Sequence, residues 1–120
     1  MFKVAVIGGG ASGLACAIEI MHTVKNRDDV KVTVLEKLPR VGKKILVTGN
    51  GRCNLTNMNS ATSGFRGDTD FAYAVLNEYT PEGNIKFFNK MGLYTRVEDE
   101  GRVYPLSNQA SSVLDALRFE

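Results

Sequence analysis

A glycine-rich segment close to the N-terminus has the residue types and the spacing that bind a pyrophosphate. The run Gly-Gly-Gly-Ala-Ser-Gly begins at Gly8. In this pattern Gly8 permits a tight turn, Gly10 leaves room for a phosphate beside the backbone, and Gly13 lets a helix pack closely. Backbone N–H groups near Ala11 and Ser12 would then face the phosphates, and the helix dipole adds about +0.5 charge at that end.

The elements around this turn are those of a dinucleotide-binding βαβ unit. Residues 2–7 form an apolar run typical of a strand buried on both faces, a helix is expected over 11–25, and a second strand over 30–35. Glu36 follows the second strand, where a carboxylate can accept both ribose hydroxyls of an adenosine. It would repel a 2′-phosphate, which disfavours NADP. The alternative is a solvated carboxylate at the end of a strand.

The next segment helps to choose between NAD and FAD, which share this fingerprint. In a simple NAD dehydrogenase the chain would soon enter another helix and strand. Here a basic stretch leads instead into a second Gly/Asn-rich loop over 45–57. The cations of that stretch could neutralise a pyrophosphate, or they could be solvated. They are Lys37, Arg40, Lys43 and Lys44.

The rest of the chain predicts short elements. They are a loop over 58–70, helices over 71–79 and 81–91, and a hairpin over 93–104 with a solvated acidic tip at 98–100. Ser107 or Asn108 is expected to cap a last helix. The expected buried face of that helix contains Ala110, Val113, Leu114 and Leu117.

Composition narrows the function classes. The chain has 120 residues and a net charge of +2, which is too small for strong electrostatic attraction to nucleic acid or a membrane. Since the N-terminal apolar run is too short for a membrane span and lacks the layout of a signal peptide, a cytoplasmic location is expected.

Cys16 and Cys53 form no disulfide framework, and Cys53 is interpreted as structural or flavin-adjacent rather than a redox thiol. His22 is expected on the surface, and no metal site is predicted.

Three segments resemble a family of bacterial NAD(P)/FAD-dependent oxidoreductases that includes aminoacetone-oxidase-like and bile-acid-dehydroxylation-linked flavoproteins. They are VIGGGASGLACAIE at 6–19, VLEKLPRVGKKILVTGNGRCNLTN at 34–57 and GRVYPLSNQASSVLDAL at 101–117. The middle segment is the most specific, because G-x-G-R-C-N-x-T-N is not a general dinucleotide signature. Together the three span nearly the whole chain.

The resemblance implies an α/β, Rossmann-like FAD-binding domain of the glutathione-reductase type that holds FAD without a covalent bond. The residues implied at the pyrophosphate are Gly8, Gly10, Ala11, Ser12 and Gly13. Those implied at the adenosine are Glu36 and Lys37, and Lys44 is a further phosphate candidate from the basic stretch. Those implied along the flavin half are Arg52, Cys53, Asn54 and Thr56.

Members of that family are much longer, so residues 1–120 are expected to be the N-terminal portion of an FAD-binding domain, without the inserted β-rich domain. The parent would be an FAD-dependent oxidoreductase with NAD(P)H as a candidate partner. The sequence identifies neither the electron donor and acceptor nor a catalytic acid or base. Two alternatives stay open. One is a NAD-binding dehydrogenase, and the other is a non-catalytic nucleotide-binding module that forms a homodimer through an exposed sheet edge.

Overall fold

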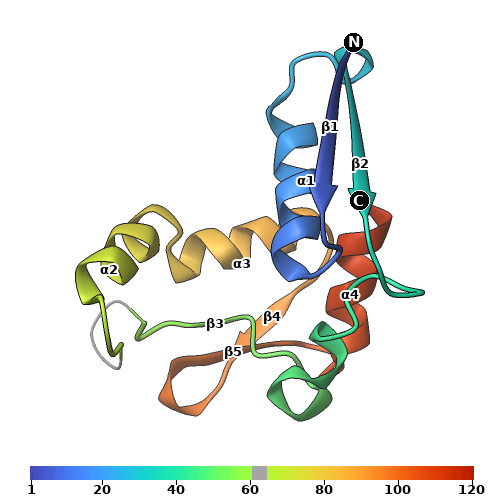
Figure 1. Ribbon diagram of the computed structural model, residues 1–120. Helices are drawn as coiled ribbons and strands as arrows, with labels where there is room; N and C mark the ends of the chain where they lie inside the picture. Colours follow the sequence, from blue (N-terminus) through green and yellow to red (C-terminus); the bar gives the residue numbers. More distant parts are fainter. Residues whose placement is uncertain (61–64) are drawn as a thin grey trace.

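The computed structural model describes residues 1–60 and 65–120. Its N-terminal part is the expected βαβ unit: β1 (Phe2–Ile7), α1 (Ala11–Thr23) and β2 (Val30–Leu35). The two strands are parallel, with Cα partners from Phe2↔Val30 to Ile7↔Leu35, and α1 lies beside them (Figure 1). The α/β, Rossmann-like fold class is therefore confirmed. The first helix ends at Thr23, two residues before the expected end, because Val24 already has an extended backbone.

One face of this small sheet differs from the sequence prediction. On one side α1 contributes Leu14 and Ile18 to the core, in agreement with its expected apolar face. On the other side Ile7 is 79% exposed and Leu35 is 51% exposed. The expectation that strand 2–7 is buried on both faces is therefore wrong, because in the described part of the chain a helix covers only one face.

A second, antiparallel sheet forms the lower part of the molecule in Figure 1. It contains β3 (Thr56–Asn57), β4 (Thr95–Val97) and β5 (Arg102–Pro105) in the order β3-β5-β4. The β4–β5 pair is the predicted hairpin. The third strand, β3, was not expected, because two residues carry no detectable alternation of polar and apolar side chains.

Two helices extend sideways from the βαβ unit (Figure 1). They are α2 (Thr69–Glu78) and α3 (Pro81–Lys90). The predicted loop over 58–70 is wrong in its last two residues, because the Asp68 side chain accepts a hydrogen bond from Phe71 N and starts α2 there. Residues 61–64 of that loop lie outside the described residues.

The last helix, α4 (Ala110–Phe119), supplies much of the core between the two sheets. Its predicted face of Ala110, Val113, Leu114 and Leu117 is buried, as expected. Its predicted caps are wrong: Gln109 is the N-cap residue and makes no side-chain cap bond. Ser107 Oγ instead accepts from Gln109 N at 3.2 Å, and Asn108 Oδ1 accepts from arginine side chains.

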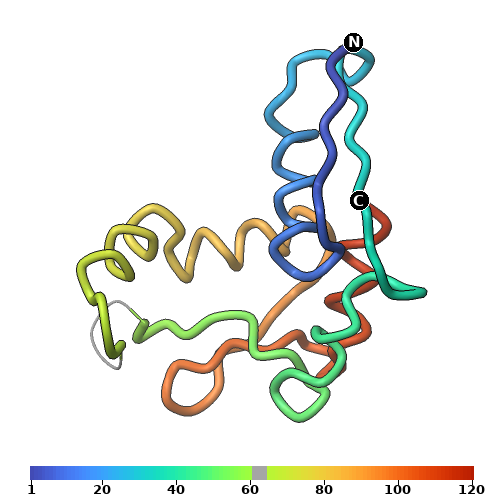
Figure 2. Tube along the Cα trace, in the orientation of Figure 1, coloured from blue at the N-terminus to red at the C-terminus, as the bar shows by residue number. Residues whose placement is uncertain are grey.

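Three short 3₁₀ segments complete the chain: η1 (Arg27–Asp29), η2 (Ile45–Gly51) and η3 (Asp99–Gly101). Between β2 and η2 the backbone returns to the glycine turn, where Gly42 N donates to Gly9 O at 2.7 Å (Figure 2). After this return η2 packs against α4. None of the helices in residues 1–60 and 65–120 has the length and hydrophobicity needed to cross a bilayer.

Candidate nucleotide-binding groove

The glycines of the turn after β1 have distinct steric surroundings. Gly8 has φ +98°, a backbone conformation that side chains disfavour. A Cβ on Gly13 would lie 1.9 Å from Gly8 O, so the helix could not pack here with any larger residue. A Cβ on Gly10 would meet nothing within 4 Å. The open space beside Gly10 is what the approach of a phosphate to the backbone requires.

The Glu36 carboxylate lies against this turn. Its Oε2 accepts from Gly9 N at 2.7 Å, and its Oε1 accepts from Leu38 N at 2.8 Å. The bond from Leu38 N and then that from Gly9 N hold the pKa of Glu36 below its ordinary value. Each carboxylate oxygen can accept a second hydrogen bond. Glu36 is therefore charged, fixed in position and still able to accept hydroxyl donors.

Gly9 has a role that the sequence did not suggest. Val41, on the returning segment, packs over it, and a Cβ on Gly9 would lie 2.5 Å from Val41 Cγ1. Because the fingerprint leaves this position unspecified, the one signal in the sequence was a glycine at the variable position between Gly8 and Gly10. Gly9 thus lets the segment after β2 cover the turn.

The second glycine loop has an unusual backbone. Gly49, Asn50 and Gly51 have φ values of +53°, +54° and +81°, and Cys53 has +60°. The loop is closed by Arg52 N donating to Gly49 O at 3.1 Å and Cys53 N donating to Thr48 O at 3.0 Å. Asn and Gly tolerate this region best, whereas Cys53 must be held in it by its surroundings.

One groove of about 1340 Å³ joins the two glycine loops. The predicted site residues that line it are Gly10, Ala11, Ser12, Lys44, Cys53 and Asn54. Away from the loops its walls are largely apolar, formed by side chains of α1, α3 and α4. The structure thus brings six of the residues singled out by sequence to one hollow.

The other predicted site residues do not line this groove. Gly8 and Gly13 form the closely packed back of the turn, and Thr56 pairs with Val103 in the small sheet. Lys37 is exposed, like the other cations of the basic stretch, Arg40, Lys43 and Lys44. Of these four, Lys44 alone lines the groove.

Arg52 points to the hairpin. Its Nη2 donates to Glu98 Oε1 at 2.5 Å and to Asn108 Oδ1 at 2.7 Å, and its guanidinium lies 3.9 Å from the centre of the Tyr104 ring. The hydrogen bond from Arg52, together with Arg96, holds the pKa of Glu98 below its ordinary value. The expectation of a solvated tip at 98–100 is therefore wrong for Glu98, which is bound by two arginines. Sequence spacing could not pair residues so far apart.

Both cysteines are free thiols and both line the groove, Cys16 exposed on α1 and Cys53 buried. His22 is exposed, as expected, and its Nε2 lies 2.7 Å from Glu120 Oε1. Within the described ranges, no three His, Cys, Asp or Glu side chains gather in a way that could hold a metal ion.

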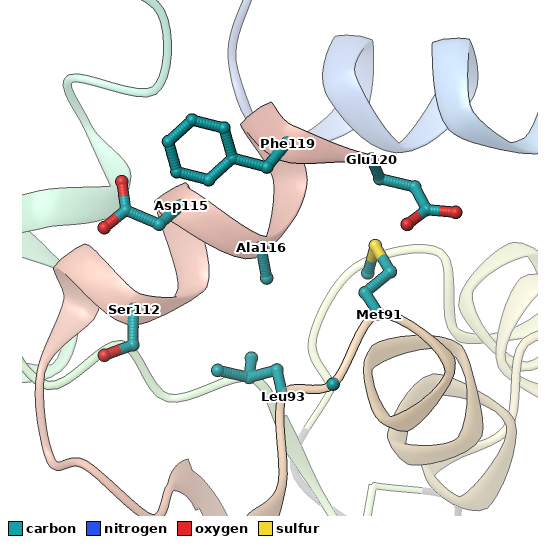
Figure 3. Close-up of a pocket in the computed structure, with 8 residues that line it drawn as sticks. Met91, Leu93, Ser112, Asp115, Ala116, Phe119 and Glu120 are labelled. Carbon is teal, nitrogen blue, oxygen red and sulfur yellow. The ribbon is translucent and has the colours of Figure 1, made fainter.

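A smaller hollow of about 430 Å³ lies between α4 and the turn that follows α3 (Figure 3). Met91 and Leu93 face Ala116 across it, and Phe119 and Glu120 also line it. None of the residues predicted to bind a nucleotide lines this hollow. The groove between the glycine loops is therefore the candidate site.

Comparison with known proteins agrees with this geometry. Residues 2–120 match the family described as HI0933-like protein Rossmann domain. The whole chain is 43% identical to part of the 3-dehydro-bile acid delta(4,6)-reductase of Clostridium scindens. The resemblance to bile-acid-linked oxidoreductases is thereby confirmed.

Two more distant relatives carry a different name. They are the ribosomal RNA dihydrouridine synthases of Haemophilus influenzae, 28% identical over 96% of the chain, and of Escherichia coli, 26% identical over 97%. The chain spans 29% of the length of the reductase, and 27% and 28% of the two synthases. Since the family match covers nearly every residue, the chain belongs to the HI0933-like Rossmann-domain family.

Proposed function

We propose that the chain is the N-terminal, FAD-binding portion of a flavin-dependent oxidoreductase. The observation that carries the proposal is the single groove that joins the phosphate-type turn at Gly10, Ala11 and Ser12 to the second glycine loop at Cys53 and Asn54. A dinucleotide has two halves joined by a pyrophosphate, and the groove offers a separate loop for each half.

The first loop supports the adenosine and pyrophosphate part of this assignment. Gly10 leaves open space at the N-terminus of α1, where backbone N–H groups and the helix dipole favour an anion. Lys44 on the same groove adds a positive charge. Beside the turn, the charged Glu36 can accept ribose hydroxyls and disfavours a 2′-phosphate.

The second loop supports FAD over NAD. An ordinary NAD-binding unit has no need for the strained turn over 48–53, whereas here it forms part of the groove wall. The matched relative with the highest identity given above is by name a reductase. We therefore assign Cys53, Asn54 and Thr56 to the flavin half, where Cys53 and Asn54 line the groove.

The bound flavin would supply the hydride or electron chemistry, and the residues of this chain would bind and orient it. No described side chain is assigned as a general acid or base. We propose NAD(P)H as the electron donor. We also propose a cytoplasmic location for the protein. The substrate would be bound by regions of the kind that the relatives have outside the part matched by this chain.

Cofactor extraction and calorimetry test the proposal. The purified protein should be yellow, and heat should release FAD rather than FMN, because FMN lacks the adenosine that Glu36 would hold. Apoprotein titrated with FAD, ADP, NADH and NADPH should bind FAD most tightly and ADP measurably. Binding of NADH in preference to FAD would instead establish the dehydrogenase alternative.

A second candidate is a nucleotide-binding module without catalysis that assembles as a homodimer. The exposed face of the β1–β2 sheet, with Ile7 and Leu35 uncovered, favours it. Light scattering over a range of protein concentrations tests this candidate. A monomer at every concentration would exclude it.

A further inference from the structure

Two arginines and two acceptors form a closed cluster next to the second glycine loop, and none of the four lines the groove. Glu98 Oε1 accepts from Arg52 Nη2 at 2.5 Å and from Arg96 Nε at 2.8 Å. Asn108 Oδ1 accepts from Arg52 Nη2 at 2.7 Å and from Arg96 Nη2 at 2.8 Å. Each acceptor therefore binds both guanidinium groups, and we call these four residues the arginine cluster.

The arginine cluster connects parts of the chain that are far apart in sequence. Arg52 belongs to the second glycine loop, Glu98 follows β4, and Asn108 precedes α4. The ring of Tyr104, from β5, stacks on the Arg52 guanidinium at 3.9 Å. The loop is thus attached to the hairpin by charge-assisted hydrogen bonds and by a cation–π contact.

The loop needs such an attachment because its backbone is strained. Cys53 occupies the left-handed region, which residues other than Gly, Asn and Asp adopt mainly when the surrounding structure imposes it. Asn50 lies in the same region, which its residue type tolerates better. Asn108 is itself in that region, with φ +57°. The attachment point, Arg52, lies directly between Gly51, at φ +81°, and Cys53.

Arg52 does not line the groove, whereas the two residues that follow it, Cys53 and Asn54, do. Its Nε and Nη2 atoms already donate within the arginine cluster. A role for Arg52 in fixing its neighbours uses these bonds as they are.

We infer that Glu98 is a positioning residue for the flavin half of the site: by binding Arg52, it fixes the turn that presents Cys53 and Asn54 to the groove. This inference rests on the proposed FAD function for its ligand. Its structural step, the ordering of the turn by Glu98, does not depend on which ligand binds. In this interpretation Arg52 connects Glu98 to the turn and does not itself contact the flavin.

The experiment compares Glu98→Gln with a matched control, Glu100→Gln, in the purified protein. Both changes replace one carboxylate of the same hairpin by an isosteric amide. Glu98 binds Arg52 and Arg96, whereas Glu100 forms its ion pair with the exposed Arg102. Hydrogen exchange of the Arg52 and Cys53 backbone amides, measured on the ligand-free protein, reports how well the turn is ordered. Exchange at these amides should rise about tenfold in Glu98→Gln and stay unchanged in the control.

Binding then separates positioning from general damage. Glu98→Gln should weaken FAD about tenfold and leave ADP binding unchanged, because ADP uses only the first loop. Arg52→Lys, which loses the paired donors, should give the same pattern, and the double variant should be no worse than either single change. These results would support the inference.

Other outcomes would overturn it. Wild-type exchange rates in Glu98→Gln would show that the turn is ordered without Glu98. Equal loss of FAD and ADP would show a general structural role. If wild-type protein bound neither ligand, the proposed function would fail by itself, and the exchange rates would still decide whether Glu98 orders the turn.

Discussion

Gly9 N donates to Glu36 Oε2 at 2.7 Å, and this bond joins the turn after β1 to the end of β2. The two features that a dinucleotide site needs, an open turn and a carboxylate, are therefore in direct contact. Leu38 N holds the other oxygen at 2.8 Å. Both donors are backbone groups, so the carboxylate position is set by the fold and not by another side chain.

Glu36→Gln should weaken the binding of both FAD and ADP about tenfold. The amide keeps one acceptor oxygen, so it cannot serve two backbone donors and two ribose hydroxyls as the carboxylate does. Calorimetry on the apoprotein measures both affinities. Asp28→Asn, an equal loss of charge in η1, is the control and should change neither. Unaltered ADP affinity in Glu36→Gln would contradict the ribose assignment.

The ionisation of Glu36 predicts how binding depends on pH. Backbone donors lower its pKa from the ordinary value of 4.5, so the carboxylate is charged at and above that pH. Its contribution to folding and to ribose binding is therefore complete above about pH 5 and is lost as the pH falls through the lowered pKa. FAD affinity should be constant from pH 8 to about pH 5 and decline only below, because the pyrophosphate of FAD, unlike the terminal phosphate of ADP, does not titrate in this range. A decline centred near neutral pH would assign the interaction to another group.

Gly10→Ala and Gly13→Ala should separate ligand binding from folding. A Cβ at Gly13 collides with Gly8 O at 1.9 Å, so this variant should lose about 2 kcal/mol or more of stability. A Cβ at Gly10 meets no protein atom within 4 Å, so stability should change by less than about 1 kcal/mol. That Cβ would nevertheless enter the space of the phosphate and reduce FAD affinity.

Thermal unfolding and calorimetry on the same two variants check this pair. The decisive comparison is Gly10→Ala, which should unfold like wild type and yet bind FAD poorly. If it bound FAD as well as wild type does, the pyrophosphate would not pass beside Gly10. If it unfolded as easily as Gly13→Ala, the open space beside Gly10 would be absent in solution.

Short-range sequence patterns predicted the βαβ unit and the hairpin well. The strands over 2–7 and 30–35 and the glycine turn follow from local composition and spacing, and the structure gives them the same bounds. The exposed face of the first sheet was not foreseen, because an apolar run indicates what a strand can bury and not what is available to cover it.

The contacts of the candidate site were harder to predict. The bond between Arg52 and Glu98 joins residues 46 positions apart, and the packing of Val41 on Gly9 depends on how the chain returns after β2. Asn108 was expected to cap a helix because its residue type favours caps, but two arginines bind its oxygen instead. Long-range partners of this kind leave no periodic signal in one sequence.

Thiol labelling tests the packing of the second glycine loop without any cofactor. Cys53, a residue of this loop, is 8% exposed and belongs to the core, whereas Cys16 is exposed on α1. In the folded protein Cys16 should react with a maleimide more than about tenfold faster than Cys53, because a buried thiol must wait for local opening. The two rates should become similar in urea. Equal rates in the folded protein would show that the loop is open in solution, which would remove one wall of the proposed groove.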